Sequence, residues 1–344
     1  MPPLISCLIP VYNAQEFLEV ALDSIQKQSF RDFEILAVND GSTDGSLNIL
    51  ETRAASDPRI RILSKPNGGI VSALNHGLEH CRGRLVARMD ADDIALPDRF
   101  AVQMAAFETH PDAVAVGGLI QSIDGRGRPI APPGSPSRVQ VTDITGFPPV
   151  VANVQHSAGT FLKSALEAVG GYRSNFPHAE DYDLYLRLAG HGTFYNPPKL
   201  VLYYRVHSAS LSMMNLERQE TSAVLAELSA YARREGLPDP GDADRPLTLD
   251  EYSALLGDLC PKQTIQRYIE FRIWRRLSGA RSKDEPRYRK AVLKRLAMLS
   301  NNLSPMDRGL NRRIVLSMGR KLLRIAREKS TRLVRRPEPV KLAG

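Results

Sequence analysis

Three carboxylates lie within four residues in the segment Asp90-Ala91-Asp92-Asp93. Carboxylates this close repel one another, so a fold keeps them together either in open water or around a cation. Two acids separated by one residue suit a hard divalent cation such as Mg²⁺ or Mn²⁺, which takes oxygen ligands and commonly bridges to phosphate. Taken alone, the segment is consistent with such a cation site and equally with a solvated acidic turn.

A second pair of acids, Glu180-Asp181, stands where a helix is expected to begin. Acids in the first turn of a helix are stabilised by the helix dipole, which is a purely structural explanation for the pair. A carboxylate that accepts a proton in a reaction is the alternative. Neither explanation follows from these two residues alone.

The elements that must position these acids alternate along the first 120 residues. Hydrophobic patterning predicts strands at 5–9, 33–38, 60–63, 84–89 and 113–120, and helices at 14–28, 47–55, 69–81 and 97–109. This alternation predicts an α/β fold, with a doubly wound, mostly parallel central sheet that carries helices on both faces. Ligands bind such sheets at the carboxyl ends of the strands, and polar clusters follow four successive strands, at 12–13, 39–40, 67–69 and 90–92. The solvated-turn explanation for Asp90 and Asp92 is weakened accordingly.

Charge divides the chain of 344 residues into two parts. The net charge of +8 combines +18 after residue 260 with −10 before it. Residues 121–212 show a less regular pattern, and 213–344 are expected to form a helical, strongly basic region. Within 305–336 apolar residues fall on one helical face and arginines on the other, which is typical of binding to an anionic membrane surface. Packing of the apolar face on the rest of the protein is the alternative.

Composition sets further limits. No apolar run approaches the ~18 residues that span a bilayer, and the N-terminus has no basic segment of a signal peptide. The three cysteines show no metal-binding spacing, which fits a reducing compartment. The expected location is the cytoplasm, with peripheral attachment at the inner face of the membrane as a further expectation. No motif indicates nucleic-acid binding.

Seven segments together resemble the family 2 inverting glycosyltransferases of the GT-A fold, over roughly residues 4–212. They are Ile9-Pro10-Val11-Tyr12-Asn13, 39–45 (Asn-Asp-Gly-Ser-Thr-Asp-Gly), Asn67-Gly68-Gly69, Asp90-Ala91-Asp92-Asp93, Gly170-Gly171-Tyr172, Glu180-Asp181-Tyr182-Asp183-Leu184 and Tyr204-Arg205-Val206-His207. Each segment is weak evidence by itself, but their order and spacing match the family. Asn39 departs from the pattern, because the family often has an aspartate there.

The resemblance implies a role for each matching residue. Pro10, Tyr12 and Asp40 would hold the base and ribose of a nucleotide, with Lys65 and Asn67 nearby. Asp92 would bind Mn²⁺ or Mg²⁺ on the diphosphate, and Asp90 would reach the ribose or a metal-bound water. Arg205 would pair with phosphate. His207 would be a third metal ligand or a diphosphate contact, with a surface histidine in a loop as the alternative. Asp181, with Glu180 as the other candidate, would be the general base. His156 would line the acceptor pocket or serve as a structural histidine.

These residues predict a metal-assisted, inverting transfer of a sugar from a nucleotide-diphosphate donor, a UDP-sugar by preference, to a hydroxyl acceptor. The acceptor is expected to be a glycan or a lipid-linked molecule in polysaccharide or glycolipid synthesis. The nucleotide sugar would bind 1–120 and the acceptor 121–212, with 213–344 as a separate region. A nucleotidyltransferase is one alternative, although Pro10-Val11-Tyr12-Asn13-Ala14 stands where such enzymes carry a glycine-rich phosphate loop. A non-catalytic sugar-nucleotide or carbohydrate-binding protein is the other.

Overall fold

A computed structural model describes residues 2–130, 133, 149, 154–206, 216–243, 245–257 and 260–279. The described residues form two compact units. One contains the described residues up to 235 and returns for 241–246, whereas the other contains 236–240 and the described residues from 247 onwards. The first unit therefore extends past residue 212, because helix α8 (Leu216–Arg234) packs against helix α6 (Glu180–Leu188).

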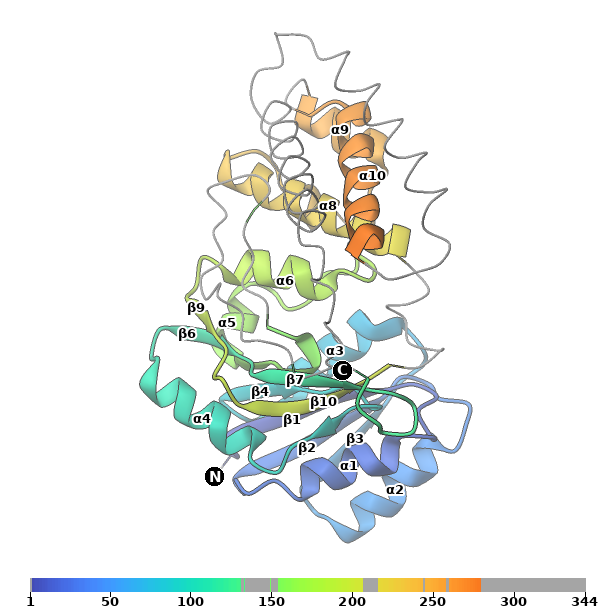
Figure 1. Cartoon of the computed structure of the whole chain (residues 1–344), viewed down its shortest axis with the longest axis vertical. Coiled ribbons are helices and arrows are strands. Elements are labelled where there is room, and N and C mark those ends of the chain that lie inside the picture. Colours follow the sequence, from blue (N-terminus) through green and yellow to red (C-terminus); the bar gives the residue numbers. More distant parts are fainter. Residues whose placement is uncertain are drawn as a thin grey trace, which may run out of the picture. The chain divides into compact units, whose positions relative to one another are not determined.

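A seven-stranded sheet forms the centre of the first unit (Figure 1). Its strands, in spatial order, are β3 (Ile60–Ser64), β2 (Phe33–Asn39), β1 (Ile5–Val11), β4 (Leu85–Arg88), β8 (Thr160–Leu162), β6 (Ala113–Val116) and β9 (Thr193–Tyr195). The first four are parallel neighbours, and β8 alone runs antiparallel to both of its neighbours. The prediction of a mostly parallel α/β sheet is confirmed.

Helices cover both faces of this sheet, as predicted. Side chains of β1 alternate between two hydrophobic cores, with Cys7 and Ile9 in one and Leu8 in the other. The first core is closed by α1 (Leu18–Gln26), α2 (Ser46–Ser56) and α4 (Arg99–Thr109). The second is closed by α3 (Gly69–His80), α5 (Lys163–Ala168) and α6. Burial on both faces explains why β1 and β2 are mostly apolar, and their buried Ser6 and Glu34 are joined by a hydrogen bond of 2.7 Å.

One predicted strand is wrong in its extent. The segment 113–120 forms two strands, since β6 ends at Val116 and β7 (Leu119–Ile123) belongs to a second, three-stranded sheet with β10 (Leu200–Arg205) and β5 (Ile94–Ala95). The chain changes sheets at Gly117-Gly118. A Cβ on Gly117 would lie 2.3 Å from Asn196 Oδ1, and Gly118 has φ +155°, so glycines are required there. The predicted extended segment 195–207 is divided in the same way, between β9 and β10.

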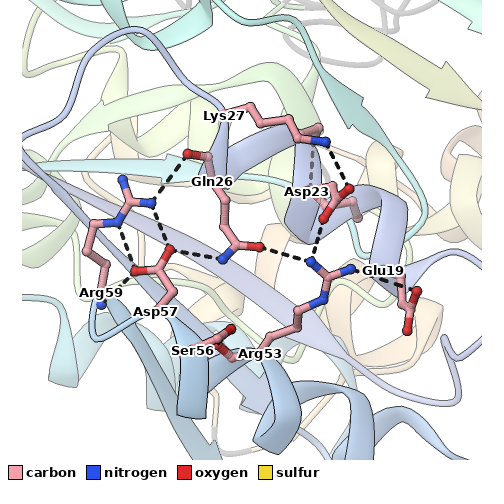
Figure 2. A network of polar contacts seen from close by, with 10 residues as sticks. Glu19, Asp23, Gln26, Lys27, Arg53, Ser56, Asp57 and Arg59 are labelled. Carbon is pink, nitrogen blue, oxygen red and sulfur yellow. Dashed lines mark hydrogen bonds and ion pairs between the residues drawn. The ribbon is translucent and has the colours of Figure 1, made fainter.

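A polar network fastens α1 to α2 and to the start of β3 (Figure 2). Arg53 of α2 lies 2.5 Å from Asp23 and 3.8 Å from Glu19, both on α1. Gln26 donates to Asp57 at 2.9 Å, and Arg59 lies 2.7 Å from the same carboxylate. The Arg59 guanidinium holds the pKa of Asp57 well below its usual range. The network fixes the two helices that begin just after the loops at the carboxyl ends of β1 and β2.

The second unit is helical in its described part, as expected. Helix α9 (Leu249–Leu256) begins at a capping box in which Thr248 and Glu251 exchange hydrogen bonds, and it packs against α10 (Lys262–Gly279). Two short 3₁₀ turns complete the described elements. One, at His156–Ala158, belongs to the first unit, and the other, at Pro240–Asp242, lies where the chain passes from one unit to the other. The strongly basic segment 280–344, which contains 305–336, lies outside the described part of the chain. Among the helices described, none combines the length and apolar character needed to cross a membrane.

Candidate functional site

The carboxyl ends of β1, β2, β3 and β4 meet at one edge of the sheet. The register pairs Val11 with Asn39 and Asn39 with Ser64. Pro10 is buried inside β1, whereas Tyr12 follows the strand and is 53% exposed. Asn13, with φ +49°, accepts a hydrogen bond from the Thr43 backbone N–H at 2.8 Å. The loops after β1 and β2 therefore form one connected surface at this edge.

Asp40 organises the loop that precedes α3. Its buried carboxylate lies 2.7 Å from Lys65 Nζ and accepts the backbone N–H groups of Gly68 at 3.0 Å and Gly69 at 2.8 Å. Asn67 donates its side-chain amide to the Asp40 carbonyl at 3.0 Å. A carboxylate that accepts the first N–H groups of a helix is stabilised by the helix dipole. Three of the residues assigned to nucleotide binding, Asp40, Lys65 and Asn67, thus form one cluster.

The acidic segment after β4 is compact. Carboxylate oxygens of Asp90, Asp92 and Asp93 all lie within 4.8 Å of one another. Asp93 is buried, and burial together with the charges of Asp90 and Asp92 raises the pKa of its carboxyl well above the ordinary value. Oxygen donors this close together fit a divalent cation of the Mg²⁺ or Mn²⁺ type. The arrangement favours a cation site over a solvated turn.

The second sheet and the 3₁₀ turn at His156–Ala158 hold this acidic segment in place. Asp93 accepts the Ser157 hydroxyl and, at 2.7 Å, the backbone N–H of Arg205 at the end of β10. The Arg205 guanidinium donates to the carbonyl of Asp92 at 2.7 Å and to that of Gly125 at 3.0 Å, and it stacks 4.6 Å from the ring centroid of Phe17. Arg205 was expected to pair with phosphate. In the structure its guanidinium instead bonds to the backbone of the loop that carries Asp92.

Arg88, the last residue of β4, belongs to none of the motifs that mark the other site residues in the sequence. Its side chain is 6% exposed, and Nη1 donates to Asp90 Oδ2 at 2.5 Å. Burial raises the pKa of Glu180, Asp181 and Tyr172, and the charge of Arg88 opposes this rise in each of them. The signal that could have revealed it is a charged residue at the end of an otherwise apolar strand, directly before the acidic segment.

The pair Glu180 and Asp181 opens α6, as predicted. Burial and the charge of Asp181 raise the pKa of Glu180 to about 7. Burial also raises the pKa of Asp181, against the effect of the Tyr182 backbone N–H, which donates to its carboxylate at 2.7 Å. The charge of Asp90 raises both pKa values further. The fold therefore brings this pair within electrostatic reach of the acidic segment after β4.

Buried polar contacts link Tyr172 to His156 and to α3. His156 Nε2 lies 2.8 Å from the Tyr172 hydroxyl, and burial lowers the pKa of the histidine well below its ordinary value. Asn75 of α3 accepts the Tyr172 backbone N–H at 2.8 Å and donates to its carbonyl at 2.8 Å. His156 is thus a buried, hydrogen-bonded histidine, the structural alternative considered for it. His207, a proposed metal ligand, lies outside the described residues.

Comparisons with known proteins identify relatives of this chain. The model for "Glycosyl transferase family 2" matches residues 6–168. The amylovoran biosynthesis glycosyltransferase AmsE of Erwinia amylovora is 32% identical over 244 residues, which cover 69% of this chain and 88% of that protein. The chain also matches bacterial chondroitin and hyaluronan synthases at 29–30% identity, but it spans only 22–31% of their length.

Solved structures share the fold. TarS 1–349 of S. aureus, in complex with UDP-GlcNAc, superposes with a TM-score of 0.55 at 16% identity and covers 79% of this chain and 80% of its own. The mannosyltransferase PcManGT of Pyrobaculum calidifontis, in complex with GDP-Man and Mn²⁺, gives a TM-score of 0.52 at 17% identity, covering 94% and 88%. The predicted GT-A architecture is confirmed.

Proposed function

The chain belongs to glycosyltransferase family 2, and we propose that it transfers a sugar from a nucleoside-diphosphate donor to a hydroxyl acceptor with inversion at the anomeric carbon. Such an in-line displacement needs a base beside the acceptor and charge neutralisation beside the leaving diphosphate. One observation carries the proposal. The Asp90 carboxylate after β4 and the buried Arg88 at the end of that strand both act on the pKa of Glu180 and Asp181 at the start of α6, although these acids are far apart in sequence.

Each group of residues in the candidate site has a distinct task in this proposal. Asp40, Lys65 and Asn67, with the exposed Tyr12, form the binding surface for the base and ribose. Asp92 and Asp90 hold the divalent cation, which would neutralise negative charge on the leaving diphosphate.

On the acceptor side, Asp181 takes the proton from the attacking hydroxyl. Burial raises the pKa of Asp181, which makes its carboxylate a stronger base than that of a solvated aspartate. Hydrogen bonds of Arg205 and Asp93 hold the loop that carries Asp92 against the end of β10.

The proposed donor is a UDP-sugar, and the proposed acceptor is a glycan or lipid-linked saccharide in the synthesis of a cell-surface polysaccharide. Support for the donor comes from the complex of TarS with UDP-GlcNAc. Support for the pathway comes from AmsE, which is named for amylovoran biosynthesis. Because PcManGT binds GDP-Man in the same fold, a release assay must compare UDP-, GDP- and dTDP-sugars.

Turnover is expected to need Mn²⁺ or Mg²⁺ and to depend on Asp92. Asp92→Asn should lower kcat/KM by roughly 10²-fold or more, since removing a carboxylate ligand weakens a contribution worth several kcal/mol. Nucleotide release is measured with each metal and with excess chelator. Asp112→Asn, at an exposed site outside the cluster, is the matched control and should behave as wild type. Full turnover in the presence of chelator would remove the metal from the proposal.

We also propose that the basic residues in 305–336 attach the protein to an anionic membrane surface. Each Arg near such a surface contributes about 1 kcal/mol, so replacing Arg312, Arg313, Arg320 and Arg324 by glutamine should weaken binding by up to about 10³-fold. Co-sedimentation with phosphatidylserine vesicles compares the full chain with this variant. Phosphatidylcholine vesicles should retain neither protein. Equal sedimentation of both proteins with the anionic vesicles would contradict the attachment.

A further inference from the structure

Two histidines and a glutamate share an outer face of α3 near its C-terminal end. The residues are His76, Glu79 and His80, whose spacing of three and four places them on the same side of the helix. One ligand atom from each lies within 4.8 Å of the others. Glu79 and His80 are exposed and His76 is half-buried, so the group is open to solvent. The proposed transfer reaction uses none of these three residues.

The orientation of His80 prepares it to bind a cation. Its Nδ1 lies 2.8 Å from the carbonyl oxygen of His76. A carbonyl can only accept a hydrogen bond, so Nδ1 carries the hydrogen and the neutral ring keeps its lone pair on Nε2. Metal-binding histidines are characteristically held in this way, with the other ring nitrogen donating to a carbonyl or carboxylate. The His76 ring is adjacent, with its centroid 4.8 Å from that of His80.

We propose that His76, Glu79 and His80 bind one divalent transition-metal ion, of which Zn²⁺ is the reference case. Two imidazole nitrogens and one carboxylate oxygen suit Zn²⁺, Ni²⁺ or Cu²⁺. Mg²⁺ and Mn²⁺ prefer a set of oxygen ligands, which the segment with Asp90 and Asp92 provides instead. Water completes the coordination shell, since this face of the helix is open to solvent.

This site lies at the opposite edge of the sheet from the acidic segment after β4. The N-terminus of α3 contacts Asp40 at the carboxyl end of β2. Its last residue, His80, accepts a hydrogen bond through its carbonyl from Arg61, near the start of β3, at 3.0 Å. The two cation sites therefore differ both in position and in ligand chemistry. A metal held by residues one helical turn apart binds only the folded helix, so it stabilises the native protein.

The test is a Zn²⁺ titration of the metal-free full chain in excess Mg²⁺, followed with a competing chromophoric chelator. One equivalent should bind, and His76→Ala and His80→Ala should each weaken binding at least tenfold. His191→Ala, which changes an exposed histidine on another segment, and Asp92→Asn should bind Zn²⁺ as wild type does. Zn²⁺ should raise the thermal unfolding midpoint of wild type and of His191→Ala but not of His80→Ala.

Two results would overturn the proposal. One is wild-type protein that takes up no stoichiometric Zn²⁺, and the other is unchanged affinity in His76→Ala and His80→Ala. If His80 serves only to interact with the negative end of the α3 dipole, His80→Ala would lower the unfolding midpoint without metal and leave Zn²⁺ binding as in wild type. Circular dichroism of both variants checks that α3 still forms.

Discussion

Replacing Asp181 by asparagine is expected to lower kcat by about 10²–10⁴-fold, the usual contribution of a general base, with little change in KM for the donor. Asparagine keeps the size of the side chain and its contact with the Tyr182 backbone N–H, so the loss reports the missing proton acceptor. Donor binding should persist because the residues assigned to the nucleotide surround Asp40, at the ends of other strands. Single-turnover kinetics at saturating donor and acceptor measure the effect.

Glu180→Gln is the matched control, because it changes the neighbouring carboxyl and leaves Asp181 in place. Burial and the charge of Asp181 raise the pKa of Glu180 to about 7, so the first proton leaves Asp181 while Glu180 is still neutral. The acid limb of kcat/KM against pH is therefore expected to stay near its wild-type position, and kcat on the plateau should stay within a few fold of wild type. The reverse result, a loss in Glu180→Gln and near-normal kcat in Asp181→Asn, would assign the base to Glu180.

Local patterning was sufficient to predict the part of the fold from β1 to α4, except for the two-residue strand β5. In β1 and β2 every residue is buried, and α1 buries Leu18, Ala21, Leu22 and Ile25 at helical spacing, so the apolar residues alone identify these elements. The prediction of one strand over 113–120 is wrong for a non-local reason. Its division depends on Asn196 and Val201, which crowd Gly117 and Gly118 from distant parts of the chain.

The candidate site shows the same contrast between local and distant information. Asp40, Asp90 and Asp92 follow parallel strands, and parallel strands end at one edge, so their grouping could be predicted from order along the chain. The surroundings of Arg88 could not, because they are assembled from Asp90, Tyr172 and the start of α6. Arg205 matches a family motif, but the motif does not predict its contacts. Its guanidinium donates to the carbonyls of Asp92 and Gly125, which only the folded chain brings next to it.

Arg88→Met is expected to destabilise the native protein by about 3 kcal/mol, the lower end of the range for removing one partner of a buried charge pair. Methionine fills much of the same space, but it leaves the Asp90 carboxylate without its 2.5 Å partner and takes away the positive charge that acts on Glu180 and Asp181. The lower end applies because the Asp90 side chain is 31% exposed and water can solvate it in part. Chemical denaturation measures the free energy of unfolding, and Arg88→Lys, which keeps the positive charge, should retain more of it.

The pH dependence of the same variants separates an electrostatic role of Arg88 from a merely structural one. Arg88 lowers the pKa of both Glu180 and Asp181, so its loss should raise these values further. A general base works only when deprotonated, so the acid limb of kcat/KM should move to higher pH in Arg88→Met. It should stay near the wild-type position in Arg88→Lys. An unshifted acid limb in a folded Arg88→Met protein would mean that Arg88 only packs the end of β4.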